Sequence, residues 1–181
     1  MKALSSSIIM VFAGLLLAAT LVSAQETPSR PKVGDKAPNV TGKTEKGKTW
    51  KLEEAVGKKT VLLYFYPKDD TPGCTKEACG FRDFWKEIQK LGAIVVGVSP
   101  DSGASHQKFQ ARYKLPFPLL SDPDKKVMTA YGAFGEKMMY GKKVTGIIRS
   151  TVWIGPDGKV KKHWARVPKA EDHPEKVLEA L

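Results

Sequence analysis

The chain has 181 residues, of which 41% are hydrophobic and 27% are charged, and its 30 basic and 19 acidic residues give a net charge of +11 at pH 7. This length suits one domain with a substantial core and leaves little room for two. The lysines occur as scattered pairs without interleaved aromatic side chains, which favours a solvated basic surface over a nucleic-acid site. We therefore expect no nucleic-acid partner.

The residue types also argue against a metal or cofactor site. The three histidines, His106, His163 and His173, show no ligand spacing with the two cysteines. The sequence also lacks a glycine-rich phosphate loop. We expect no metal ion.

The first 24 residues have the parts of a secretory signal peptide. Lys2 supplies positive charge, residues 8–22 form an apolar run, and Val22-Ser23-Ala24 ends it with small residues. No cysteine follows the expected cleavage point to take a lipid anchor. We expect export to a periplasmic or other extracytoplasmic compartment, no stable membrane association after removal of residues 1–24, and one domain over residues 25–181. An uncleaved membrane anchor is the alternative.

The remaining chain alternates apolar runs with amphipathic segments. Residues 40–52 predict a hairpin, and residues 60–66 predict a strand buried on both faces. Residues 71–91 predict one helix, because its apolar side chains recur at spacings of three and four. The members of this stripe are Cys74, Ala78, Phe81, Trp85 and Ile88.

Strands and helices continue to alternate toward the C-terminus. Residues 147–154 and 159–165 predict a hairpin closed by Gly155-Pro156-Asp157-Gly158, and Pro174 begins a final helix. This pattern predicts an α/β fold, a thioredoxin-like three-layer sandwich with a mixed central sheet. Between residues 93 and 131 we expect strands at 93–99 and 117–120 and helices at 105–113 and 125–131.

Cys74 has the most informative position in the chain. Thr71 is placed to cap the helix and Pro72 suits its first position, so Cys74 falls in the opening turn, where backbone N–H groups lack partners. Helix starts and cationic neighbours lower the pKa of a cysteine from its usual value of about 8.5 and so favour the reactive thiolate. The pattern indicates a nucleophile.

Cys79 is the other cysteine of the chain. In a small exported protein, two cysteines alone suggest a permanent disulfide. In a continuous helix, however, an offset of five residues separates the Cα atoms by about 8.6 Å, beyond the span of about 7 Å that a disulfide tolerates. A bridge between Cys74 and Cys79 would therefore be transient and would require local unwinding.

The segment Pro67-Lys68-Asp69-Asp70-Thr71-Pro72-Gly73-Cys74 resembles the Pro-x-x-x-Thr-x-x-Cys signature of peroxiredoxins. Its continuation over residues 75–83 is similar to their bacterioferritin comigratory protein or PrxQ branch, as are residues 115–124, 140–143 and 146–151. The resemblance extends from about residue 33 nearly to the C-terminus. It implies a thioredoxin-like fold, a peroxidase activity toward hydrogen peroxide and organic hydroperoxides, and no cofactor.

The resemblance also implies a role for each candidate site residue. Cys74 would attack the peroxide, and Cys79 would resolve the sulfenic acid as an intramolecular disulfide. Thr71 would hydrogen-bond the peroxide oxygens, Pro67 would shield the sulfur from water, and Arg149 would stabilise the thiolate and the departing oxygen. A thioredoxin-like dithiol would then reduce the disulfide. Because Arg149 lies in an apolar strand pattern, we expect a partner for its charge.

Two other functions are left open by the sequence. One is a thiol–disulfide oxidoreductase acting on exported proteins, although such enzymes use Cys-x-x-Cys and this chain has four residues between its cysteines. The other is a non-enzymatic basic binding protein with a structural disulfide. In each case we expect a monomer, because no extended C-terminal arm follows the last predicted helix.

Overall fold

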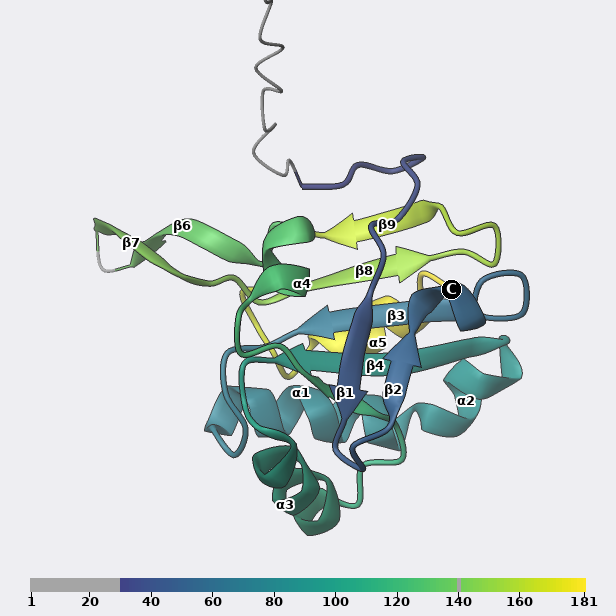
Figure 1. Cartoon of the computed structure of the whole chain (residues 1–181), viewed down its shortest axis with the longest axis horizontal. Helices are drawn as coiled ribbons and strands as arrows, with labels where there is room; N and C mark the ends of the chain where they lie inside the picture. Colours follow the sequence, from purple (N-terminus) through teal and green to yellow (C-terminus); the bar gives the residue numbers. More distant parts are fainter. Residues whose placement is uncertain (1–29, 140) are drawn as a thin grey trace, which may run out of the picture.

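The computed structural model describes residues 30–139 and 141–181, and Figure 1 shows them as a central sheet with helices packed against it. The predicted signal peptide, residues 1–24, lies outside this part of the chain. Strands β3, β4 and β5 are parallel, whereas the outer strands are antiparallel. The strands, in spatial order, are β2 (Thr49–Lys51), β1 (Thr41–Thr44), β5 (Leu119–Ser121), β4 (Ala93–Ser99), β3 (Thr60–Phe65), β8 (Ser150–Ile154) and β9 (Val160–Trp164).

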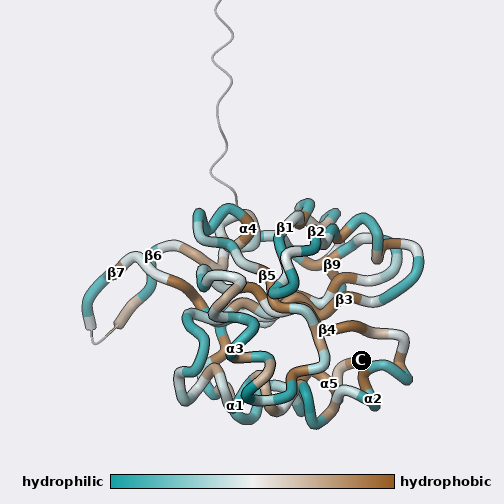
Figure 2. Tube along the Cα trace, turned by 60° about the horizontal axis from the view of Figure 1, so that its bottom comes forward, coloured by the Kyte–Doolittle hydropathy of each residue, from teal (hydrophilic) through white to brown (hydrophobic). Residues whose placement is uncertain are grey.

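Helices cover both faces of the sheet, but unequally. One face carries α4 (Lys126–Ala130) and the 3-10 turn η1 (Leu52–Glu54). Figure 2 shows the other helices together beneath the sheet, with apolar chain concentrated between the layers. They are α1 (Pro72–Asp83), α2 (Trp85–Lys90), α3 (Gly103–Tyr113) and α5 (His173–Leu178). The predicted α/β sandwich with a mixed sheet is confirmed, and none of the described helices has the length and apolar character needed to cross a bilayer.

Strand β3 positions the site because it lies at the centre of both cores. Its side chains alternate: Val61, Leu63 and Phe65 enter the core under α4, whereas Leu62 and Tyr64 enter the core under α1. Each of these five side chains is at most 1% exposed. The strand therefore holds its C-terminal end, and the loop that follows, at a fixed point above α1.

The single helix predicted over residues 71–91 is wrong, because Phe84 leaves the helical conformation at φ −90° and ψ 9° and separates α1 from α2. Successive residues of a regular helix point about 100° apart. The break lets the neighbours Phe84 and Trp85 pack against the same core, with the Trp85 ring 5.8 Å from that of Phe117. The buried stripe of Cys74, Ala78, Phe81 and Ile88 is confirmed.

The continuous strand predicted over residues 147–154 is also wrong. Residues 148 and 149 lie outside any strand, between β7 (Lys142–Ile147) and β8, and β7 pairs with β6 (Phe134–Met139) in a separate hairpin. Ile148 N–H donates to Ala133 O at 2.7 Å, and Arg149 O accepts from Val167 N–H at 2.9 Å. These hydrogen bonds lie outside the sheet ladder. They orient the backbone so that the Arg149 side chain faces α1.

We predict that Gly97→Ala will lower the free energy of unfolding by about 1–3 kcal/mol. A Cβ at residue 97 would lie 2.7 Å from Leu119 Cδ2 and 2.8 Å from Tyr64 Oη, so the core would have to shift. The matched control is Gly135→Ala in β6, where an added Cβ meets no atom within 4 Å. Urea unfolding of both variants tests this, and equal midpoints would contradict it.

A second prediction concerns His173, at the start of α5, whose Nε2 lies 2.8 Å from Thr151 Oγ1. Burial, with the charges of Arg149 and Lys176, lowers the pKa of His173 to about 4 from 6.5. Between these values the unfolded chain binds a proton that the folded protein excludes, so stability falls as the pH drops through this range, by up to roughly 3 kcal/mol. His173→Gln should lose less stability between pH 7 and pH 4.5 than the wild type in urea unfolding. An identical loss in the two proteins would refute the assignment.

Candidate active site

Cys74 and Arg149, 75 residues apart, meet at the start of α1. Pro72 occupies the first turn of that helix, and Cys74 follows two residues later with an exposed fraction of 1%. Arg149 Nη2 donates to Cys74 Sγ at 3.1 Å. The guanidinium stays protonated throughout the physiological range, so it holds a permanent positive charge beside the sulfur.

Arg149 has the charged partner that the sequence led us to expect, and this partner is Glu77, one helical turn after Cys74. Its carboxylate is completely buried and pairs with Arg149 Nη1 through Oε2. Burial raises the pKa of Glu77 to about 7, against the opposing effect of Arg149. Burial would lower the pKa of Arg149, but the negative charges of Glu77 and Cys74 outweigh it and raise that pKa. One guanidinium therefore pairs with two acidic groups, the Glu77 carboxylate and the Cys74 sulfur.

Thr71 occupies the N-cap position as predicted, but its hydroxyl does not cap the helix. Thr71 Oγ1 donates to Lys68 O at 3.0 Å, while its backbone carbonyl accepts from Thr75 N–H at 2.9 Å. The side chain thus stabilises the loop before the helix. Its hydroxyl still has acceptor capacity, and it sits half-buried three residues before Cys74.

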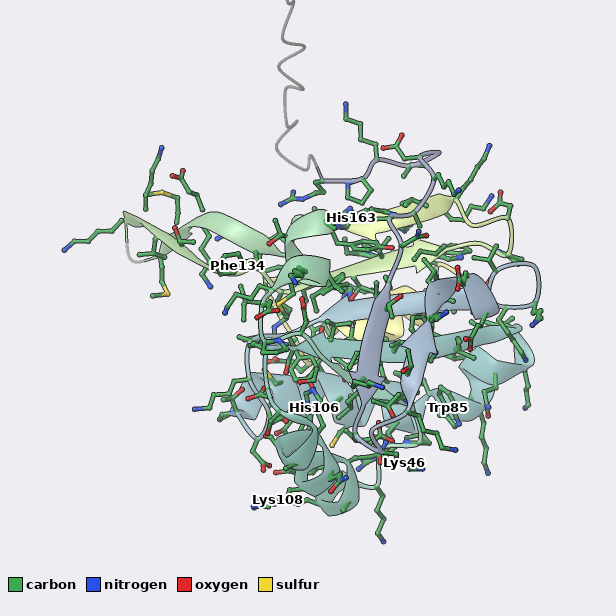
Figure 3. The ribbon with its side chains drawn as sticks, viewed as in Figure 1. Lys46, Trp85, His106, Lys108, Phe134 and His163 are labelled. Atoms are coloured by element: carbon green, nitrogen blue, oxygen red, sulfur yellow. The ribbon has the colours of Figure 1, made fainter. Side chains whose placement is uncertain are left out.

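A buried polar network holds the loop between β3 and α1. Asp69 contacts His106 Nδ1 at 2.8 Å, and it accepts hydrogen bonds from Ser105 Oγ at 2.7 Å and Tyr66 Oη at 2.8 Å. Burial alone would raise the pKa of Asp69, but these hydrogen bonds lower it. His106, labelled in Figure 3, comes from α3, so the network joins the loop to a second helix.

A cavity of about 450 Å³ adjoins the Arg149 side chain. Pro67 and Arg149 both line it, so the structure brings these two predicted residues together at its wall. Cys79 lies elsewhere, half-buried on α1, and both cysteines are free thiols. The intact helix between Cys74 and Cys79 keeps the thiols apart.

Two features of the site were missed at the level of sequence. Glu77 follows Cys74 by three residues, next to Ala78 on the buried stripe, so a carboxylate at that spacing was a usable signal. The Asp69–His106 contact joins residues that are 37 positions apart, so no local pattern in the sequence indicates it. In residues 30–139 and 141–181, no three His, Cys, Asp or Glu side chains are grouped to hold a metal ion.

A thioredoxin-like fold that buries one cysteine at a helix start against a paired arginine defines the class of thiol-dependent peroxidases. Comparison with known proteins agrees: the AhpC/TSA family matches residues 33–163. Peroxiredoxin Bcp of Bacillus subtilis is 44% identical over 150 residues, which cover 83% of this chain and 94% of the relative.

Solved structures extend the comparison. The bacterioferritin comigratory protein of Xanthomonas campestris is 38% identical with a TM-score of 0.75, and the match covers 83% of this chain and 94% of the other. A PrxQ mutant from Xylella fastidiosa is 35% identical with a TM-score of 0.77, over 84% and 96% of the two chains. The chain belongs to the AhpC/TSA family, in its bacterioferritin comigratory protein or PrxQ branch of peroxiredoxins.

We predict that Arg149→Gln will slow the oxidation of reduced Cys74 by hydrogen peroxide by about 10²- to 10³-fold, because a preorganised charged donor to the reacting atoms is lost. Stopped-flow tryptophan fluorescence measures the rate. Arg166→Gln removes a nearby exposed arginine and serves as the control. Since Arg149→Gln leaves Glu77 unpaired, the double variant Arg149→Gln/Glu77→Gln should recover stability and remain slow. Oxidation of Cys74 at the wild-type rate in the double variant would contradict the role of Arg149.

Proposed function

We propose that this protein reduces hydrogen peroxide and organic hydroperoxides at Cys74, with Cys79 as the resolving cysteine and a thioredoxin-like dithiol as the reductant. The contact of 3.1 Å between Arg149 Nη2 and Cys74 Sγ carries the proposal. A single buried cysteine beside a permanent cation and helix N–H groups is suited to nucleophilic attack.

In the first step the Cys74 thiolate attacks one peroxide oxygen. An S–O bond forms, the O–O bond breaks, and the other oxygen leaves and takes a proton as water or an alcohol. Arg149 donates hydrogen bonds to the sulfur and to the oxygens on which charge develops. Thr71 would contact the peroxide on the side of the loop, and Pro67 limits access of water to the sulfur.

In the second step the Cys79 thiol attacks the sulfur of the Cys74 sulfenic acid, which forms a disulfide and releases water. This step requires α1 to open, because the intact helix holds the two Cα atoms about 8.6 Å apart. The close packing of Gly80 on Pro174 opposes this opening, because it would be lost. The packing is so close that a Cβ added at residue 80 would lie 2.7 Å from Pro174 Cγ. A dithiol donor then reduces the disulfide and becomes a disulfide itself.

The substrate class is supported by the cavity beside Pro67 and Arg149, which has room for the organic part of a hydroperoxide. The structure of the Xanthomonas campestris relative was studied for its alkyl peroxide reduction activity. We extend the proposal to export by residues 1–24, to a monomeric protein, and to a reductant located outside the cytoplasm.

We predict that Cys74→Ser will abolish consumption of hydrogen peroxide, whereas Cys79→Ser will complete one turnover and stop in the presence of thioredoxin and its reductase. The sulfenic acid trapped on Cys74 should react with dimedone and be detected by mass spectrometry. Full turnover in Cys74→Ser would overturn the proposal. Continued thioredoxin-dependent turnover in Cys79→Ser would overturn its second step. Rapid reduction of insulin by the wild type without peroxide would favour a thiol–disulfide oxidoreductase.

A further inference from the structure

The cavity beside Arg149 has walls from two separate parts of the chain. The β6–β7 hairpin projects from the body of the molecule in Figure 1, with Phe134, labelled in Figure 3, at its base. This hairpin lines one side of the cavity, and residues 165–167, after β9, line the other. Pro67 and Arg149 complete the lining, and Arg149 also donates to Cys74 Sγ at 3.1 Å, so this side chain connects the cavity to the reacting sulfur.

Three cations other than Arg149 line the cavity, namely Arg30, Lys137 and Arg166. None of them takes part in an ion pair within residues 30–139 and 141–181. Each instead contacts a backbone carbonyl, at 3.5 Å for Arg30, 2.6 Å for Lys137 and 3.4 Å for Arg166. The contacts of the two arginines are long, and each guanidinium has further donors to offer.

The acidic member of the lining does not neutralise these cations. Glu136 pairs with Lys143 at 3.8 Å, across the hairpin. The cavity therefore presents a net positive charge, and its two arginines, Arg30 and Arg166, are exposed and accessible to a ligand. An anion that enters would gain charge-assisted hydrogen bonds.

The rest of the lining is apolar, and its two methionines are exposed. Met138 and Met139 are 51% and 47% exposed, which is unusual for large apolar side chains. Ile147, Ile148 and Val167 continue the apolar lining toward Arg149. Flexible methionines adapt to alkyl chains of varied shape. A volume of about 450 Å³ is within the range of small-molecule sites.

We infer that this cavity selects organic hydroperoxides that carry a carboxylate group, such as fatty-acid hydroperoxides, and that Arg30 and Arg166 determine this selectivity. The carboxylate binds the two arginines, the alkyl chain lies on Met138 and Met139, and the hydroperoxide group reaches Cys74. This inference rests on the proposed peroxidase function and adds a preference for charge to it. Arg30 and Arg166 act on binding and do not take part in the O–O cleavage.

The test compares three oxidants of the reduced full-length protein in stopped-flow experiments without reductant: a fatty-acid hydroperoxide below its micelle concentration, its methyl ester, and hydrogen peroxide. The wild type should react with the free acid at least about fivefold faster than with the ester. In Arg30→Gln/Arg166→Gln this advantage should fall below about twofold, while the rate with hydrogen peroxide changes by less than about twofold. Lys90→Gln, on α2 far from the hairpin in Figure 1, should keep the advantage.

A non-reactive competitor gives a second readout of the same site. Dodecanoate should slow the reaction of the wild type with the free acid and have little effect on the reaction of the double variant. Equal rates for acid and ester in the wild type, or an advantage retained in the double variant, would overturn the inference and leave the peroxidase proposal intact. If hydrogen peroxide also fails to oxidise Cys74, the proposed function itself is refuted.

Discussion

The guanidinium of Arg149, held between the Cys74 sulfur and the Glu77 carboxylate, is the interaction on which the site depends. A buried positive charge is costly unless it is paired and hydrogen-bonded. Here one nitrogen faces each acidic partner, so the charge is satisfied in the resting protein. In the proposed reaction, the same charge would stabilise the peroxide oxygens once the sulfur begins to react.

Sheet topology makes this interaction possible. β8 runs antiparallel to β3 with Ser150 opposite Phe65, so Arg149 lies beside the loop that follows β3. That loop is tied to α3 through Asp69 and His106, and it delivers the start of α1 to the same place. The Cys74 sulfur and the Arg149 cation therefore come from distant segments whose ends are held by strands β3 and β8.

In the proposed mechanism, α1 must be stable enough to present Cys74 and labile enough to release Cys79. Phe81 and Ala78 are completely buried, and Gly80 packs against Pro174 of α5, so the middle of the helix is well fixed. Opening it must sacrifice part of this packing. In the proposed mechanism, the resolving step therefore depends on a local rearrangement, and the contact between α1 and α5 sets its cost.

Much of the fold could be predicted because its strands and helices carry strong local patterns. The run over residues 60–66 and the stripe from Cys74 to Ile88 identified the central strand and the helix beneath it, and the role of Arg149 as a paired charge followed from its apolar neighbours. The break at Phe84 could not be predicted, because it depends on packing two adjacent aromatic rings against Phe117 and the core around it. The β6–β7 hairpin was missed for a related reason: its exposed strands show weak alternation, and a strand pattern continued through Ile148 and Arg149.

Glu77 shows where sequence reasoning stops. Its spacing from Cys74 allows Glu77 to lie on the buried face. The same spacing also allows its side chain to turn to solvent, so the sequence alone does not decide between the two positions. Only the position of Arg149 in three dimensions explains a carboxylate with no exposed surface.

The central claim is that the sulfur beside Arg149 is the one that peroxide oxidises. The most direct measurement is to treat the reduced wild-type protein with one equivalent of hydrogen peroxide, count the free thiols, and identify the linked peptides by mass spectrometry. Both thiols should be lost, and Cys74 and Cys79 should be found joined by a disulfide. Two free thiols after treatment would contradict it.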